Sequence, residues 1–379
     1  MNGELPFWEL FQMIPYQGEH PQNVFIQNGW EEYSHKHILK KKDEIFYLEK
    51  SNEWGLRKKI TNPYEAIFST SDTKTFPSIA LISPLSRSYF KMVEMLHVCD
   101  FWNLVSKNTP FKSAHICEGP GGFLQCVVEE GKRRKLLFGA AYAMTLKSTK
   151  SQIPGWKRSS RFLKKHPEIQ LLYGADMTGN ILVKRNQDFF CETVKSVNIF
   201  TADGGFDFST DYSKQEETSF LLVLASFYIG LRCVQKGGVL IIKLFDIYSP
   251  IMLDLIIGTA SYCKSFVIYK PATSRPCNSE RYFIGQGYSG IEESLAWIKH
   301  LEKAQVKHVE KPLTRLCEID PESPYIVAIK EQIEWQEELQ LNNIETAINM
   351  TKNDIEYHIR NTIEKSIEWC EAFSVPYSL

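Results

Sequence analysis

An alternation of short apolar segments with helical patterns, running from about residue 113 to residue 284, constrains the fold of this chain more than any other feature. The seven apolar segments are Ala114–Cys117, Leu136–Ala141, Ile169–Tyr173, Val197–Thr201, Val239–Leu244, Phe266–Tyr269 and Tyr282–Ile284. Helical patterns lie between several of them, most clearly at Glu216–Val234 and Pro250–Cys263. Strands that alternate with helices are typical of a mostly parallel sheet covered by helices. The sequence therefore predicts an α/β protein.

The last two predicted strands are separated by only about ten residues, Lys270–Glu280. A helical crossover between parallel strands needs about a dozen residues or more. The connection is therefore too short for a crossover, and the final strand is predicted to run antiparallel. The expected sheet has seven strands, with six of them parallel and the last one antiparallel.

The sequence divides into three parts around this pattern. Residues 1–110 are predicted to be a helical or irregular N-terminal extension, residues 111–290 the α/β core, and residues 291–379 a helical, acidic C-terminal extension. The formal net charge of −1 hides an uneven distribution. The segment Glu318–Glu371 carries thirteen acidic and four basic residues, a net of −9, so the remainder carries +8.

Two charged stretches each allow two interpretations. Gly131–His166 holds eleven Lys or Arg residues and no Asp or Glu. Such a stretch forms either a phosphate-binding surface or a solvated helix or loop face, and both remain open. The acidic C-terminal segment is interpreted as a solvated helical face, with a docking surface for a basic partner as the alternative.

Several classes of protein are disfavoured by what the sequence lacks. The nine cysteines include no CxxC pair, so we expect a reducing compartment and neither a disulfide framework nor a metal site. The longest apolar stretch, Ser219–Leu231, has 13 residues, whereas a membrane span needs roughly 20. The first ten residues, MNGELPFWEL, have no basic and apolar signal-peptide regions. We therefore expect a protein of the cytoplasm or nucleus, of cellular or viral origin, that is neither secreted nor in a membrane.

A glycine-rich turn follows the first predicted strand and opens a helix. It comprises Cys117, Glu118, Gly119, Pro120, Gly121, Gly122 and Phe123. Glycines let the backbone approach a ligand closely, and the helix N-terminus presents free N–H groups. The second strand leads into Ala141–Lys147, which contains no acid, so a dinucleotide site is disfavoured. The turn predicts a nucleoside-type cofactor, with a purely structural turn as the alternative.

Three charged residues are predicted to meet at the carboxyl edge of the sheet, where ligands bind in open α/β folds. Asp203 follows the fourth strand, Lys243 lies near the end of the fifth, and Glu280 opens the antiparallel last strand. A lysine at the end of an apolar strand is costly unless it is paired. The group is therefore either a structural ion pair or a functional site beside the glycine turn, and we favour function.

Four motifs make the sequence resemble a known family: GPGGF, TADGGFD, IIKLFD and KPATSRPCNSERY. In this order, over roughly residues 80–290, they resemble the RrmJ/FtsJ-like RNA ribose 2′-O-methyltransferases that use S-adenosyl-L-methionine. They are most similar to the eukaryotic and viral mRNA cap 2′-O-methyltransferases. The resemblance implies a Rossmann-like methyltransferase fold, S-adenosyl-L-methionine as cofactor and capped mRNA as substrate.

The resemblance also implies a Lys-Asp-Lys-Glu tetrad. Asp203, Lys243 and Glu280 match its last three members. The first lysine should lie on a helix shortly before the glycine turn, and Lys91 fits because it follows the Ser-Arg-Ser at residues 86–88. Lys107 and Lys112 are nearer the turn but lack this context.

Further contacts are implied by the same resemblance. The glycine turn would hold the methionine and ribose parts of the cofactor, and Asp176 would reach its adenine. The residues expected to touch RNA are Arg87, Ser213, Lys214, Gln215 and Asn278. Two departures from the family, Glu118 and Asn180, affect only the detailed cofactor contacts.

The function implied is methylation of the ribose 2′-hydroxyl of the first transcribed nucleotide, with Lys243 as general base. Lys91 would lower the pKa of Lys243, while Asp203 and Glu280 would orient the two ammonium groups. The alternatives are methylation of the second cap nucleotide, of ribosomal or transfer RNA, or a non-catalytic RNA-binding scaffold. Other capping or transcription proteins are conceivable partners of the acidic segment.

Overall fold

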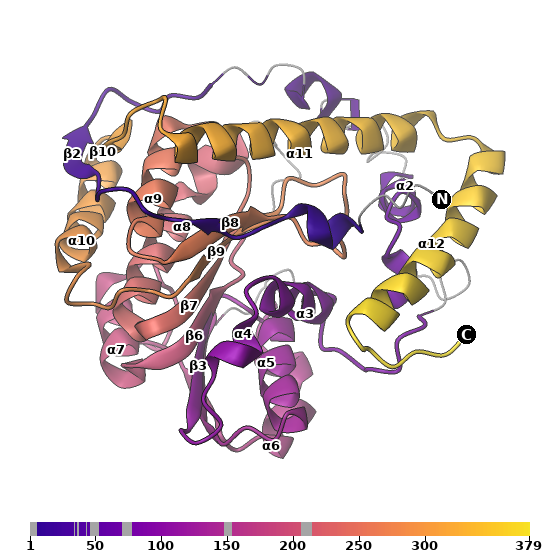
Figure 1. The fold of residues 1–379 in the computed structure, drawn as a ribbon, viewed down its shortest axis with the longest axis horizontal. Coiled ribbons are helices and arrows are strands. Elements are labelled where there is room, and N and C mark those ends of the chain that lie inside the picture. Colours follow the sequence, from indigo (N-terminus) through magenta and orange to yellow (C-terminus); the bar gives the residue numbers. More distant parts are fainter. Residues whose placement is uncertain are drawn as a thin grey trace.

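The computed structural model describes residues 6–33, 35, 38–42, 44–45, 53–69, 78–147, 154–205 and 214–379. Its centre is an eight-stranded sheet in the order β1-β8-β9-β7-β6-β3-β4-β5 (Figure 1). The strands are β1 (Ile14–Pro15), β3 (Phe111–Ile116), β4 (Phe138–Met144), β5 (Ile169–Leu172), β6 (Val197–Ala202), β7 (Val234–Leu244), β8 (Ser265–Tyr269) and β9 (Arg281–Gln286).

Strands β3 to β7 are parallel to one another. Strand β9 inserts between β7 and β8 and is antiparallel to both, with Tyr282 opposite Lys243 on one side and Tyr269 on the other. The predicted α/β sheet with an antiparallel last strand is thereby confirmed. The connection from β8 to β9 is a hairpin between adjacent strands, as its length requires.

The sheet has one strand more than the predicted seven. Strand β1, only two residues long, pairs antiparallel with the outer edge of β8. A second, two-stranded sheet joins β2 (Gln22–Ile26) to β10 (Arg315–Glu318), so it links the N-terminal and C-terminal parts of the chain. These short strands lack the buried alternation by which strands are recognised in a sequence, and we predicted none of them.

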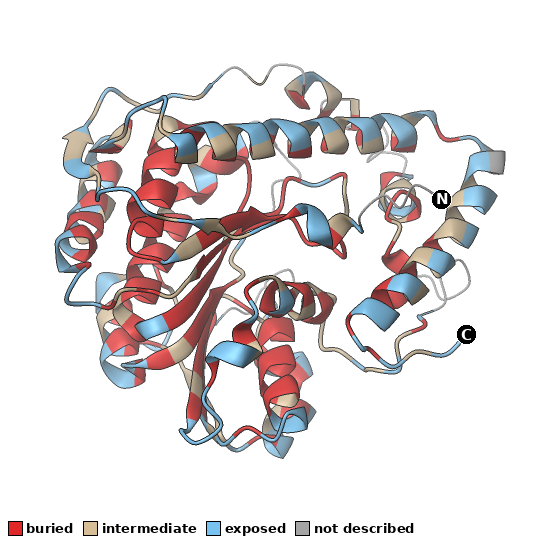
Figure 2. Cartoon of the chain, viewed as in Figure 1, coloured by how far each residue is buried: buried red, intermediate tan, exposed pale blue. Residues whose placement is uncertain are grey.

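Helices cover both faces of the large sheet, and alternate strand residues point into two cores. On one face pack η3 (Trp156–Ser159), α3 (Ser88–Val98), α4 (Phe101–Leu104), α5 (Gly122–Arg133) and α6 (Ser160–Lys165). On the other pack α7 (Lys184–Val194), α8 (Gln215–Cys233), α9 (Pro250–Ala260) and α10 (Leu295–Glu310). Ile241 faces the first core and Ile242 the second. Figure 2 shows the central strands buried between the two layers.

Two long helices complete the chain at its C-terminal end, α11 (Pro324–Asn349) and α12 (Lys352–Ala372). Helix α11 runs along one side of the molecule, and α12 lies beside α2 (Trp54–Ile60) and η2 (Glu65–Ile67) (Figure 1). The short η1 (Phe7–Leu10) contacts α11, where Phe7 stacks on Trp335. The buried side of α11 carries residues such as Ile329 and Ile333, while Glu331, Glu334 and Glu338 lie exposed. None of the helices in the described ranges is long and apolar enough to span a membrane.

Candidate active site

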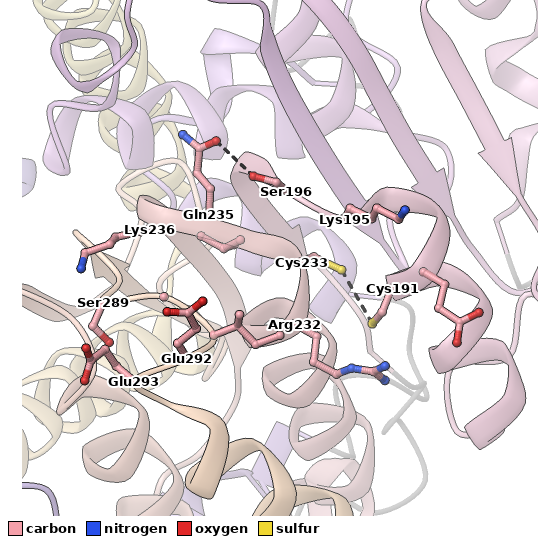
Figure 3. Close-up of a pocket in the computed structure, with 14 residues that line it drawn as sticks. Cys191, Lys195, Ser196, Arg232, Cys233, Gln235, Lys236, Ser289, Glu292 and Glu293 are labelled. Carbon is pink, nitrogen blue, oxygen red and sulfur yellow. Dashed lines mark hydrogen bonds between the residues drawn. The ribbon is translucent and has the colours of Figure 1, made fainter.

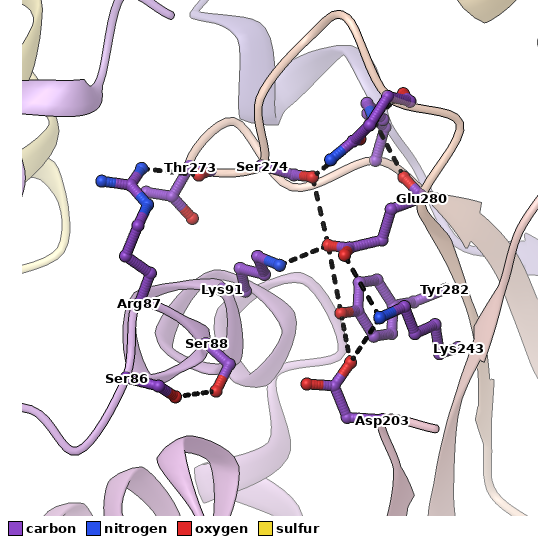
Figure 4. A network of polar contacts seen from close by, with 12 residues as sticks. Ser86, Arg87, Ser88, Lys91, Asp203, Lys243, Thr273, Ser274, Glu280 and Tyr282 are labelled. Carbon is purple, nitrogen blue, oxygen red and sulfur yellow. Dashed lines mark hydrogen bonds and ion pairs between the residues drawn. The ribbon is translucent and has the colours of Figure 1, made fainter. Parts of the chain in front are cut away.

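Four side chains from four separate elements meet at the carboxyl edge of the sheet. Lys91 comes from α3, Asp203 follows β6, Lys243 lies near the end of β7, and Glu280 precedes β9. Lys91 Nζ lies 2.5 Å from Glu280 Oε1, and Lys243 Nζ lies 3.3 Å from Glu280 Oε2 and 3.4 Å from Asp203 Oδ1 (Figure 4). The predicted residues thus form one connected group, in which each oxygen of Glu280 faces a different amine.

A tyrosine that the sequence analysis did not single out holds the two carboxylates in place. Tyr282 Oη lies 2.8 Å from Asp203 Oδ1 and 3.2 Å from Glu280 Oε1. Its single proton can be donated to either carboxylate. Ser274 Oγ donates a further hydrogen bond to Glu280 Oε1, at 3.1 Å. Tyr282 stands two residues after Glu280, and residues two apart in a strand share a face. That spacing was the signal that could have identified it.

The charges in this group determine which protonation states are favoured. Burial acts against the charge of Glu280, but Lys91 and Lys243 outweigh it, so the pKa of this carboxyl lies well below its usual range. Burial also acts to lower the pKa of Lys243, but Asp203 and Glu280 outweigh it, so that pKa is raised above the usual lysine value. The sequence left the net shift open between the push from Lys91 and the pull of the carboxylates, and in this arrangement the carboxylates prevail. The ion-pair partner of Lys91 is Glu280, at 2.5 Å.

The start of α3 is fixed against the glycine turn, and this contact places Lys91. Ser86 and Ser88 are hydrogen-bonded to each other at 2.6 Å and lie against Gly122. A side chain on Gly122 would collide with both hydroxyls, so only glycine allows the helix to approach this closely. The Ser-Arg-Ser context used to choose Lys91 therefore has a structural reason.

The arginine within that context lies against the protein interior. The guanidinium of Arg87 donates to the carbonyl oxygens of Thr273, at 3.0 Å, and Phe68, and it pairs with Glu65 at 3.5 Å. The hydrogen bond to Thr273 ties Arg87 to the β8–β9 connection. A direct contact between Arg87 and RNA stays a prediction.

The glycine turn lies between β3 and α5, at the same edge. Gly121 has a φ of 103°, a conformation that favours glycine, and it leaves the start of α5 without a side-chain cap. The first backbone amides of α5 can therefore take a ligand carboxylate, which fits the amino-acid end of S-adenosylmethionine. The turn lies directly beside the four charged side chains, because Gly122 contacts the start of α3.

Glu118 departs from the family at this turn, and its side chain points into the sheet. It is 4% exposed, accepts a hydrogen bond from Thr201 Oγ1 and lies 3.3 Å from His115 Nδ1. Burial raises the pKa of Glu118. Any cofactor contact by this residue would therefore come from its backbone.

The predicted adenine-binding residue follows β5. Oδ1 of Asp176 accepts hydrogen bonds from the hydroxyl and amide of Thr178, at 2.6 and 3.0 Å, and from Asn186 Nδ2, at 2.8 Å. The hydroxyl of Thr178 is the largest cause that lowers the pKa of Asp176 to about 2. Oδ2 has a single long contact, with Arg185 at 3.4 Å, so it retains capacity to accept from a ligand amino group.

The residues expected to touch RNA gather partly on one loop. Ser213 lies outside the described residues, and Lys214 is exposed just before α8. Gln215 accepts a hydrogen bond from Ser279 Oγ at 2.8 Å, next to the exposed Asn278. The structure therefore brings Gln215 and Asn278 to the same connection that carries Glu280.

The basic stretch divides into paired and unpaired cations. Lys132 lies 2.6 Å from Glu168, and Arg133 lies 2.5 Å from Glu130. Five exposed cations on η3 and α6 have no such partner within the described ranges: Lys157, Arg158, Arg161, Lys164 and Lys165. This part adjoins the glycine turn, because Ser159 Oγ donates to the carbonyl oxygen of Pro120. Lys135 and Lys147 are also exposed and have no ion-pair partner in those ranges, but η3 and α6 carry five such cations together, next to the glycine turn.

A separate cavity of about 590 Å³ lies at the opposite, amino edge of the sheet (Figure 3). It is bounded by the end of α7, the start of β7 and the residues after β9. Its lining includes Lys195 and Lys236 but also Glu292 and Glu293, so it presents both signs of charge. None of the four tetrad residues lines this cavity.

Comparison with known proteins gives one family match. The sequence model of the FtsJ-like methyltransferases matches residues 84–288, which is more than half of the chain and includes all four charged residues. The chain is 26% identical over 275 residues to cap-specific mRNA (nucleoside-2′-O-)-methyltransferase 1 of Trypanosoma brucei brucei, covering 69% of this chain and 72% of that protein. Its identity to the protein of the same name in Leishmania braziliensis is 28% over 299 residues, covering 74% of this chain and 71% of that protein. The mouse protein of this name is 30% identical over 280 residues, covering 68% of this chain but only 31% of the mouse protein.

Proposed function

Because the chain belongs to the FtsJ-like methyltransferase family, we propose that it methylates the ribose 2′-hydroxyl of the first transcribed nucleotide in capped mRNA, using S-adenosylmethionine. The chain of contacts of 2.5–3.4 Å that joins Lys91, Glu280, Lys243 and Asp203, beside the glycine turn, is the observation that carries the proposal. The names of the relatives support the capped substrate. Such an enzyme would work in the nucleus or cytoplasm, where capped transcripts occur.

The mechanism depends on the acceptor oxygen and its proton. When bound, S-adenosylmethionine supplies an electrophilic methyl group, which the 2′-oxygen attacks. We assign Lys243 as the general base that takes the hydroxyl proton on Nζ, because it is the amine placed between both carboxylates. Asp203 and Glu280 hold that amine in position, and Lys91 fixes Glu280 from the other side.

Space for the acceptor is preserved next to Lys243. A Cβ atom on Gly205 would lie 3.6 Å from Lys243 Nζ and 3.1 Å from the ring of Phe245. The absence of this side chain leaves room for a ribose at the reactive amine. The remaining catalysis would come from alignment of the oxygen with the methyl group.

Both carboxylates oppose the amine form of Lys243 that a base requires. The raised pKa means that Lys243 is an ammonium at neutral pH before substrate binds. The general-base assignment therefore requires that activity increases with pH through the neutral and alkaline range. This requirement makes the assignment testable by kinetics.

The experiment that tests the function measures transfer of labelled methyl from the cofactor to matched RNAs. The substrates are an uncapped RNA, the same RNA with a cap, and a capped RNA already methylated on its first nucleotide. Label only on the unmodified capped RNA supports the proposal. Label on uncapped RNA would indicate a ribosomal or transfer RNA enzyme, label on the premethylated RNA would indicate the second nucleotide, and label on none would indicate a scaffold.

Variants separate catalysis from cofactor binding. Lys243→Ala should abolish transfer but leave cofactor affinity unchanged by calorimetric titration, because Lys243 lies at the acceptor side of the site. Lys303→Ala, an exposed lysine on α10, is the matched control and should retain full transfer. Substantial turnover by Lys243→Ala would remove Lys243 from the role of base.

A further inference from the structure

A buried lysine beside the four charged residues has no part in the mechanism above. Lys270 directly follows β8 and is 5% exposed. Its Nζ donates to Asn278 O and Asn278 Oδ1, both at 2.6 Å, and to Glu280 O at 3.0 Å. These bonds tie the first residue of the β8–β9 connection to two of its last three residues. Lys270 thus closes the loop that ends in Glu280.

The chemistry of an ammonium fixes the orientation of the Asn278 amide. Burial lowers the pKa of Lys270 to about 7, so its ammonium form predominates below neutral pH. In that form Lys270 Nζ carries three N–H donors and no acceptor, and it faces three oxygens, so each proton has one partner. The amide must therefore turn its oxygen toward Lys270. Asn278 is exposed, and its Nδ2 has no hydrogen-bond partner within the described part of the chain.

The other half of the connection is fixed by a buried carboxylate of α3. Glu94 accepts hydrogen bonds from the amides of Ala272 and Thr273, at 2.6 and 2.9 Å, and from the hydroxyls of Thr273 and Tyr269, at 2.6 and 2.7 Å. Glu94 lies on the helix that carries Lys91. The loop is therefore anchored at both halves, so a side chain on it can be held in one orientation.

We propose that Lys270 is a positioning residue that turns the NH₂ group of Asn278 outward, where it donates a hydrogen bond to an acceptor oxygen of the RNA sugar-phosphate backbone. The proposal rests on the function proposed above. An oriented NH₂ group can only donate, and the RNA backbone offers phosphate and hydroxyl oxygens as acceptors. Asn278 lies two residues before Glu280, so this contact would hold RNA next to the acceptor ribose.

The first test compares two substitutions of the exposed Asn278. Asn278→Ala removes the donor, whereas Asn278→Asp keeps the oxygen that faces Lys270 and replaces the NH₂ group by a negatively charged oxygen. We expect affinity for capped RNA, measured by fluorescence anisotropy, to fall about tenfold for Ala and further for Asp, a size typical of a hydrogen bond to a charged group. Cofactor affinity should not change. Asn108→Asp, at the amino edge of the sheet, is the control for the added charge and should bind RNA as the wild type does.

The second test asks whether Lys270 acts through Asn278. Lys270→Met should weaken RNA binding by about the same factor as Asn278→Ala, and the double variant should be no weaker than Lys270→Met alone. Effects that multiply would overturn the proposal, as would an Asn278→Asp variant that binds RNA as tightly as the wild type. The binding readout is independent of turnover. A wild type that binds capped RNA without methylating it would therefore refute the proposed function but leave the result for Asn278 and Lys270 readable.

Discussion

Replacement of Glu280 by glutamine should shift the pH dependence of methyl transfer toward lower pH. Glu280 is one of the two carboxylates that hold Lys243 in its ammonium form. Its amide isostere keeps the shape of the side chain but removes the negative charge. The positive charge of Lys91, which Glu280 neutralises in the wild type, would also act on Lys243. Both changes favour the amine form of Lys243.

The distances give the size of the shift. At 3.3 Å, a unit charge pair in an effective dielectric constant of about 20 interacts by about 5 kcal/mol. This value is an upper limit, because the two side chains are 15% and 11% exposed and water screens them in part. Since one pKa unit corresponds to about 1.4 kcal/mol, a shift of about 2 units in the pKa of Lys243 is a conservative expectation.

The assay is the pH profile of kcat/KM for labelled methyl transfer to capped RNA. For the wild type, log kcat/KM should rise by about one unit per pH unit from neutral pH upward, because the amine fraction of Lys243 grows tenfold per unit. The Glu280→Gln profile should reach its plateau at lower pH, with a lower plateau because Lys243 is less well oriented. Glu293→Gln, an exposed residue at the amino edge, should leave the profile unchanged.

The titratable groups of the site around Lys243 come from four elements. They are Lys91 on α3, Asp203 after β6, Lys270 after β8, and Glu280 and Tyr282 on the β9 side. Burial lowers the pKa of Lys270 to about 7, so this lysine also titrates near neutral pH. A wild-type profile that is flat from pH 6 to pH 10 would refute Lys243 as the base. A Glu280→Gln profile with its midpoint unchanged would show that the carboxylate does not control the pKa of Lys243.

Three further variants test neighbouring parts of the site. Gly205→Ala places a methyl group beside Lys243 Nζ and should lower kcat/KM about 100-fold by displacing the ribose, with cofactor affinity unchanged by calorimetry. Asp176→Ala should weaken cofactor binding about tenfold, whereas RNA affinity should stay the same; an unchanged cofactor affinity would exclude an adenine contact. The double variant Lys157→Glu, Arg161→Glu should weaken RNA binding and make it less sensitive to salt, and an unchanged salt dependence would show that this basic surface does not hold phosphates.

The meeting of Asp203, Lys243 and Glu280 could be predicted from the sequence because it follows from strand direction alone. The parallel strands β6 and β7 end at the same edge of the sheet. The short connection before β9 forces that strand to begin at the edge where β8 ends. No knowledge of side-chain packing was needed for this step. Knowledge of side-chain packing was needed to predict the shift in the pKa of Lys243, because the direction of that shift depends on which charges lie nearest.

Other parts of the site depend on contacts that leave no pattern in the sequence. The position of Lys91 follows from the packing of α3 against the glycine turn, so it could be chosen only from the resemblance of its context. Most hydrogen bonds of Lys270 and Glu94 are made to groups of the loop at residues 271–280. That loop has no hydrophobic periodicity from which these contacts could be predicted. Strand β1 escaped prediction because two residues cannot establish an alternation.

The segments before and after the predicted core also support the loop that carries Glu280. Arg275 donates to the buried Glu65 at 2.9 Å, and Gln340 of α11 donates to the carbonyl oxygen of Cys277 at 3.1 Å. Lys91 itself lies before residue 110, so a boundary there would separate it from the carboxylate it contacts. The domain boundaries at residues 110 and 290 remain predictions from the sequence. The β8–β9 connection is held by residues from both sides of each boundary.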